Sequence, residues 1–188
     1  MILLKKKFIV KIPKNISVLY CDKKNLFIFL GEQDRKFYKP LVKVFFNKNL
    51  NEIIVTDVLL KPKKKLNANA IARTTVSDLK NSFIEANFLL FSKLNLVGVG
   101  YRVFNYENFR TQIYFKLGYS HLIFFKIPQH LEVFCHKNAS LFLYGFSSYN
   151  ALTELSAQIR FCKRPEPYKG KGILLDQEKI ALKKGKRV

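Results

Sequence analysis

The chain has 188 residues and a net charge of +21, from 34 Lys and Arg residues against 13 Asp and Glu residues. Hydrophobic residues make up 48% of it and include 18 Phe, so the composition excludes a disordered chain and predicts a packed core. A compact domain with this much positive charge repels itself unless a polyanion neutralises it. The charge therefore favours nucleic acid as the partner, ahead of an acidic membrane or protein surface.

The start of the chain and its cysteines exclude several further classes. Lysines follow a short apolar run at residues 1–10, which is the reverse of a secretory signal. No apolar run reaches the roughly 20 residues of a membrane helix, so we expect no membrane insertion. Cys21, Cys135 and Cys162 are far apart and form no C-x-x-C pair, which predicts a reducing compartment without a disulfide scaffold or zinc ribbon.

Short apolar segments bounded by turn residues predict strands in the first half of the chain. They cover residues 8–12, 16–20, 26–30, 42–46 and 52–56. A basic loop at 61–65 follows, and we expect it to be solvated, with an RNA contact as a further role. Apolar residues at spacings of three and four then predict a helix from about 67 to 91.

The second half repeats this style. Strands are predicted at 94–104, 112–117, 122–127, 131–135 and 141–144. Leu152, Leu155 and Ile159 share one face of a second helix, with Ser147 or Ser148 as its N-cap. This helix is expected to end near Arg160, because the prolines at 165 and 167 cannot continue it.

An internal repeat links the two halves. Ile12-Pro13, Val18 and Leu26-Phe27 recur 115 residues later as Ile127-Pro128, Val133 and Leu141-Phe142. Chance similarity between two β-hairpins is one interpretation, and two copies of a small module is the other. We expect an α+β fold of two tandem similar modules, each a small, mostly antiparallel sheet packed against one helix. The predicted domains are 1–92 and 93–173, followed by a basic tail at 174–188.

Motifs for catalysis, metals and cofactors are weak. Gly98-Val-Gly100 lacks the third glycine and the helix of a dinucleotide-binding motif, so we expect Gly100 to permit a bulge or a close backbone approach. His130 and His136 flank a strand and are poorly placed to share a metal. The carboxylates are scattered. We therefore predict no enzymatic activity, no metal, no cofactor and no small-molecule substrate.

The segment 163–172 is the strongest candidate site. Its two prolines stiffen a loop, its glycines let backbone approach a phosphate, and Tyr168 can stack on a base or sugar. Glu166 is expected to orient a neighbouring cation. Between Arg160 and Val188 there are ten basic and three acidic residues, for which a solvated tail is the alternative reading. The candidate RNA-binding residues are Lys163, Arg164, Tyr168, Lys169, Gly170, Lys171, Gly172, Lys183, Lys184, Lys186 and Arg187.

The run Pro165-Glu-Pro-Tyr-Lys-Gly-Lys-Gly-Ile173 resembles the signature of the ribosomal protein L-six family of the large ribosomal subunit. Leu96-Val-Gly-Val-Gly-Tyr-Arg102 and Leu117-Gly-Tyr-Ser-His121 fit the same family, and the resemblance covers nearly the whole chain. It implies two similar α+β modules, no catalysis, and binding to large-subunit rRNA near the sarcin–ricin region and the base of the stalk. Neighbouring ribosomal proteins are the other implied partners.

The resemblance adds Arg160, Tyr119, Ser120, His121 and Arg73 to the candidate RNA-binding residues. The chain also departs from the family pattern. Val76 follows Thr74-Thr75 where the family has Arg, and Leu174-Leu175 replaces Arg-Tyr, so an apolar stretch there is expected to pack against protein.

The departures, with an amino-acid usage typical of AT-rich genomes, favour a ribosome of the mitochondrial matrix. A plastid or the bacterial cytoplasm is the alternative location. A free-standing RNA-binding assembly or regulatory factor, not retained in mature ribosomes, is the alternative function.

Overall fold

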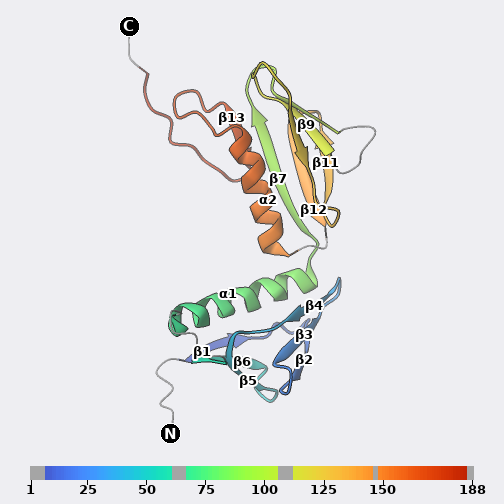
Figure 1. Ribbon diagram of the computed structural model, residues 1–188, viewed down its shortest axis with the longest axis vertical. Coiled ribbons are helices and arrows are strands. Elements are labelled where there is room, and N and C mark those ends of the chain that lie inside the picture. The colour runs from blue at the N-terminus through green and yellow to red at the C-terminus, as the bar shows by residue number, and fades with distance from the viewer. Residues whose placement is uncertain (1–6, 61–66, 106–111, 146–147, 186–188) are drawn as a thin grey trace. The chain divides into compact units, whose positions relative to one another are not determined.

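The computed structural model describes residues 7–60, 67–105, 112–145 and 148–185. The chain forms two compact units, Met1–Phe88 and Leu89–Val188. Each unit consists of antiparallel strands and one helix, so the predicted α+β fold is confirmed (Figure 1). The units divide four residues before the boundary predicted at 92/93, because the helix of the first unit ends at Asn87 and a strand begins at Leu90.

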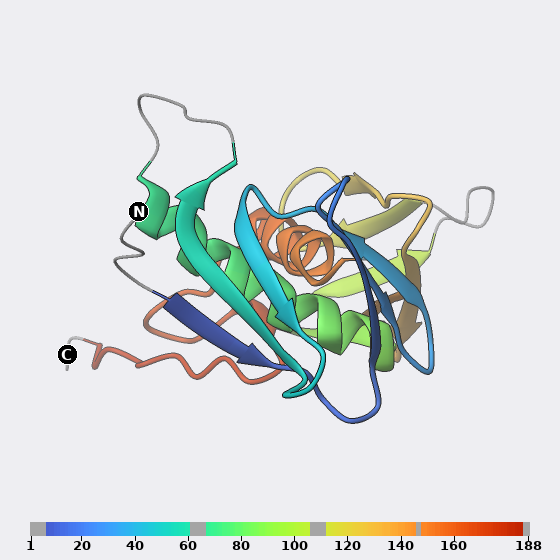
Figure 2. The ribbon, with the colours of Figure 1, turned by 90° about the horizontal axis from the view of Figure 1, so that it is seen from below.

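Within the part of the first unit that the structure describes, the chain forms two three-stranded antiparallel sheets and helix α1 (Ala68–Asn87). One sheet has the order β1-β6-β5 and the other β2-β3-β4. The strands are β1 (Lys7–Lys11), β2 (Ser17–Cys21), β3 (Leu26–Leu30), β4 (Arg35–Tyr38), β5 (Val42–Asn47) and β6 (Glu52–Leu59). Helix α1 lies along one face of these strands (Figure 2) and buries Leu79 and Phe83 against a core that includes Phe27, Phe29 and Ile53. Strand β4, which carries two cations in four residues, has no counterpart among the predicted strands.

Helix α1 has defined ends. The side chain of Asn67 accepts a hydrogen bond from the backbone N–H of Asn69 at 3.2 Å, which caps its N-terminus. At the other end the N–H of Phe88 donates to the carbonyl of Ile84 at 2.9 Å, and Phe88 is already extended. The sequence predicts this helix as far as residue 91, but the apolar residues at 90 and 91 belong to the next strand.

The described residues of the second unit form helix α2 (Tyr149–Cys162) and seven strands. They are β7 (Leu90–Val97), β8 (Arg102–Asn105), β9 (Gln112–Lys116), β10 (Ile123–Lys126), β11 (Glu132–His136), β12 (Ser140–Gly145) and β13 (Gly172–Leu175). One sheet has the order β11-β12-β7-β13 and the other β10-β9-β8. Helix α2, capped by Ser148, packs on β7, β12 and β13 and buries Leu152, Leu155 and Ile159.

Two features of the second unit differ from the predicted elements. The single strand predicted over 94–104 is two strands, because Gly98 and Gly100 have positive φ angles of 154° and 74° and turn the chain between them. A Cβ atom at Gly98 would lie 2.7 Å from the ring of Tyr101, whereas the space at Gly100 is open. The close approach expected at Gly100 therefore belongs to Gly98. The apolar stretch after Gly172 forms β13 and pairs with β7.

The internal repeat corresponds to a shared hairpin. The N–H of Ile16 donates to the carbonyl of Pro13 at 3.2 Å, and 115 residues later that of Leu131 donates to Pro128 at 3.1 Å. The turn of the second hairpin is one residue shorter, so buried Phe27 corresponds to buried Leu141, an offset of 114. The sequence repeat suggested that Phe27 corresponds to Phe142, and this correspondence is therefore wrong by one residue.

In the described part of the chain, no helix is long and apolar enough to cross a membrane.

Candidate RNA interface

The segment 163–172 is a loop that closes on itself between α2 and β13. The N–H of Ile173 donates to the carbonyl of Lys163, and the N–H of Glu166 to that of Lys171, both at 2.9 Å. Inside this ring the N–H of Gly170 donates to the carbonyl of Glu166 at 2.9 Å. These backbone bonds, with the two prolines, fix the path of the loop before any partner arrives.

The two glycines of the loop have different structural roles. Gly170 adopts φ +71°, a left-handed conformation that favours glycine. Gly172 is buried, and a Cβ atom there would lie 2.6 Å from the Cα atom of Pro165. Gly172 was predicted to admit a phosphate, but the backbone of Pro165 occupies that space, so the glycine serves to close the loop.

The charged side chains of the loop point outward to different extents. Arg164 and Lys169 are exposed, as is Tyr168 with 53% of its surface accessible, and Lys163 and Lys171 are half-buried. The carboxylate of Glu166 is exposed and forms no ion pair with any described residue, so the predicted role of orienting a cation is not seen.

The C-terminal segment runs back along this loop. The N–H of Lys183 donates to the carbonyl of Pro167 at 2.8 Å, and the Leu182 side chain lies beside Gly170. Lys183 and Lys184 are exposed and therefore extend the positive charge of the loop. Lys186 and Arg187, also predicted to bind RNA, lie outside the described residues, as does the basic loop at 61–65.

Lys163 joins the loop to the turn between β9 and β10. Its Nζ atom lies 4.0 Å from the centroid of the Tyr119 ring, a cation–π contact. The Tyr119 hydroxyl donates to the carbonyl of Cys162 at 3.2 Å, and its ring stacks with that of His121 at 5.7 Å. Ser120, between these two rings in sequence, is exposed. The structure thus brings Tyr119 to the loop, with His121 stacked against its ring.

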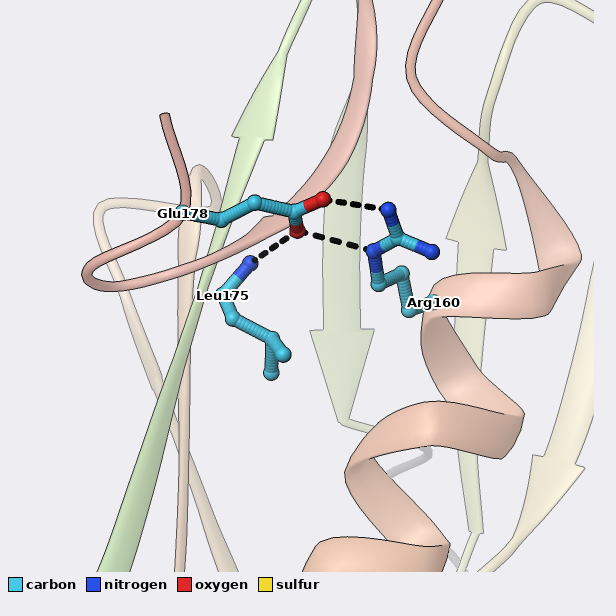
Figure 3. A network of polar contacts seen from close by, with 3 residues as sticks. All are labelled: Arg160, Leu175 and Glu178. Carbon is cyan, nitrogen blue, oxygen red and sulfur yellow. Dashed lines mark hydrogen bonds and ion pairs between the residues drawn. The ribbon is translucent and has the colours of Figure 1, made fainter. Parts of the chain in front are cut away.

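Arg160 is held by an acidic residue of the same unit (Figure 3). Its Nε atom donates to Oε2 of Glu178 at 2.8 Å and Nη2 donates to Oε1, while the N–H of Leu175 donates to the same carboxylate at 3.2 Å. The hydrogen bond from Arg160 lowers the pKa of Glu178, and the same bond raises the pKa of Arg160. One edge of the guanidinium that was predicted to meet RNA is therefore occupied within the protein.

A second acidic residue of the C-terminal segment is also paired. Nζ of Lys93, on β7, lies 2.8 Å from Oδ1 of Asp176, and a hydrogen bond from Lys93 lowers the pKa of this carboxyl. Two of the three carboxylates beyond Arg160 are thus neutralised by cations of α2 and β7. The excess positive charge of the loop is left to face solvent.

Comparison with known proteins gives the family. The uL6 protein of Mycoplasmoides gallisepticum is 36% identical over 184 residues, which are 95% of this chain and 93% of the relative. The uL6m protein of Reclinomonas americana is 30% identical over 95% of each chain, and uL6 of Listeria innocua is 34% identical over 72% of each. This chain belongs to the uL6 family of large ribosomal subunit proteins. No family model matches it.

In this uL6 chain two aromatic residues belong to the site although the sequence patterns do not point to them. Phe161, at the end of α2, lies 4.1 Å under the guanidinium of Arg164, and Tyr101 lies 6.0 Å from Nζ of Lys163. Both hold loop cations in place, and only their contacts reveal this.

The remaining candidate, Arg73, is an exposed residue of α1 in the first unit. Among the described residues, no cluster of His, Cys, Asp and Glu is arranged to hold a metal ion.

Proposed function

We propose that this uL6 chain binds large-subunit rRNA through the loop 163–171 and the adjoining Lys183 and Lys184. The family resemblance suggests a position near the sarcin–ricin region, where translation factors bind. The observation that carries the proposal is the closed basic loop beside two neutralised carboxylates. Cations on a preorganised backbone lose little entropy when they meet phosphates, and they release counterions from the RNA.

The cations of the loop and Tyr168 each have a proposed part. Arg164, Lys169 and Lys171 contact phosphates, and Tyr168 stacks on a base or sugar. Lys163 is held over Tyr119, so it presents its charge together with the neighbouring Tyr119–His121 stack. Lys186 and Arg187 continue the same contact. Arg160 and Gly172 act through the protein, one by anchoring the segment after β13 and the other by closing the loop.

The contribution to the ribosome is structural and not catalytic. Neutralising phosphates lets RNA helices pack closely, and the apolar strand β13 binds the loop rigidly to its sheet. Other ribosomal proteins are proposed neighbours. We further propose the mitochondrial matrix as the location, with a plastid or bacterial ribosome as the alternative. Fractionation of mitochondria, plastids and cytoplasm followed by detection of the chain in each ribosome pool decides this.

Sedimentation tests the proposal. The wild-type chain should sediment with mature large subunits through a sucrose gradient at moderate salt. A chain that remains at the top of the gradient contradicts a ribosomal role. A chain found only on precursor particles supports the free-standing assembly factor instead.

A further inference from the structure

A row of aromatic side chains crosses the second sheet of the second unit. Phe104 on β8 is in register with Tyr114 on β9, and Tyr114 is in register with Phe124 on β10. The rings of Phe104 and Tyr114 stack with centroids 5.1 Å apart, and those of Tyr114 and Phe124 are 6.1 Å apart. The alternating residues Val103, Ile113 and Phe115 are buried, so the aromatic row lies on the outward face.

Phe124 lies at the edge of the sheet. Strand β10 is an edge strand, and 60% of the surface of Phe124 is accessible. A large aromatic ring with this exposure on an edge strand offers apolar surface that a flat partner can cover.

The charges that the described strands carry on this face are all of one sign. Arg102 and Lys116 are paired in register on one side of the aromatic row, and Lys126 lies on the other side, two residues from Phe124. All three are exposed, and they form no ion pair with any described residue. Strands β8, β9 and β10 carry no acidic residue. Such a face favours a partner that carries both flat apolar rings and negative charges.

The other sheet of this unit carries a different set of charges beside its exposed aromatic residue. Phe134 on β11 is also exposed, at 54%, and contacts Phe142. The same face carries Glu132 two residues away, and Lys93 there is paired with Asp176. Its charges are mixed and partly neutralised, which suits a protein surface. The described strands β8, β9 and β10 contain no such acids.

We infer that the outward face of β8, β9 and β10 is a second RNA contact, one that binds unpaired bases. A base stacks on the exposed surface of the Phe124 ring, and Lys126, Lys116 and Arg102 meet the phosphates on either side. Stacking on aromatic rings and basic residues along the backbone are the two elements of single-strand recognition. The inference rests on the proposed function and adds to it a single-stranded ligand, distinct from the phosphate contacts of the 163–171 loop.

A single tryptophan makes the contact measurable. The chain has no Trp, so Phe124→Trp introduces one fluorophore on the proposed platform, and Phe134→Trp introduces a matched one on the mixed-charge face. Titration with a single-stranded oligoribonucleotide should quench Trp at 124 to saturation and leave Trp at 134 unchanged. Inorganic polyphosphate and an abasic oligonucleotide supply charge without bases and should quench neither. Equal quenching by these probes, or equal quenching at 134, overturns the inference.

Affinity gives a second readout. Phe124→Ala should weaken binding of the single strand roughly tenfold, the effect of losing one stacked base, and Phe134→Ala should change it less than about twofold. If neither variant changes the affinity for the single strand while the wild-type chain still sediments with large subunits, the inference fails and the proposed function stands. If ribosomal proteins still bury Trp at 124 after the RNA is digested, the inference is also overturned, because the partner of this face is then a protein. Loss of sedimentation would count against the proposed function itself.

Discussion

The guanidinium of Arg160 and the carboxylate of Glu178 bind the end of α2 to the segment that follows β13. The same carboxylate accepts the N–H of Leu175, the last residue of β13, so one acidic side chain fixes both elements. The pair has two effects. It sets the direction in which the C-terminal segment leaves the sheet, and it removes a negative charge from beside the basic loop.

This pair predicts a pH-dependent stability. Replacing Glu178 with Gln should lower the free energy of unfolding at pH 7 by about 1 kcal/mol, since the pair is partly shielded and bidentate. The pKa of Glu178 is lowered in the folded chain, so its stabilising effect is complete above the ordinary value of 4.5 and disappears as the pH falls through the lower folded value. Thermal unfolding from pH 7 to 3 checks this. A difference between wild type and variant that persists unchanged at pH 3 contradicts it.

Closure of the loop depends on Gly172. Its replacement by Ala places a Cβ atom against the backbone of Pro165, so the loop must open or shift. We expect a cost of about 1–3 kcal/mol in unfolding free energy, together with weaker RNA binding. Gly185→Ala is the matched control, because nothing lies near a Cβ atom there. Chemical denaturation of both variants measures the difference, and equal stability would show that the loop tolerates the side chain.

Tyr119 supports the loop through both its ring and its hydroxyl. Tyr119→Phe removes only the hydrogen bond to Cys162, and Tyr119→Leu also removes the ring beneath Lys163. We expect each step to cost about 0.5–1 kcal/mol, so the Leu variant should be the less stable of the two. Unfolding free energies of the two variants test the order. Equal values would mean that the cation–π contact contributes nothing.

The three cysteines should differ in reactivity. Burial raises the pKa of the Cys135 thiol to about 11, and burial also raises that of Cys162, whereas Cys21 is exposed. Because the thiolate is the nucleophile, iodoacetamide at pH 8 should modify Cys21 first in the folded chain. Peptide mass spectrometry over time gives the order, and unfolded protein serves as the control. Faster labelling of Cys135 would contradict its burial.

Much of the fold follows from local patterns. The apolar spacing of α2 and its Ser148 cap determine that helix, and the alternation of Val42, Lys43 and Val44 in β5 determines which of these residues are buried. Strand β4 is not predicted by such patterns, because Arg35 and Lys36 dominate a four-residue segment that is stabilised by pairing with β3 and by contacts with α1. The break between β7 and β8 depends on the backbone conformations of Gly98 and Gly100, which single-residue preferences leave open.

The candidate site, like the fold, could be predicted only in part from the sequence. Its position and charge are readable in the run 163–172, but the partners of its side chains are not. The pairing of Arg160 with Glu178 and of Lys93 with Asp176 joins residues that are distant in sequence. Only the folded chain brings them together, and this is why Arg160 resembles an RNA ligand in the sequence and acts as an anchor in the structure.

The salt dependence of RNA binding tests whether the loop 163–171 contacts phosphates. The affinity of the wild-type chain and of a Lys169→Ala, Lys171→Ala double variant for large-subunit rRNA should be measured from low to moderate salt. If both lysines contact phosphates, the logarithmic slope for the variant should be smaller by about 2, roughly one for each lost contact. An unchanged slope would show that the loop does not lie against the RNA backbone.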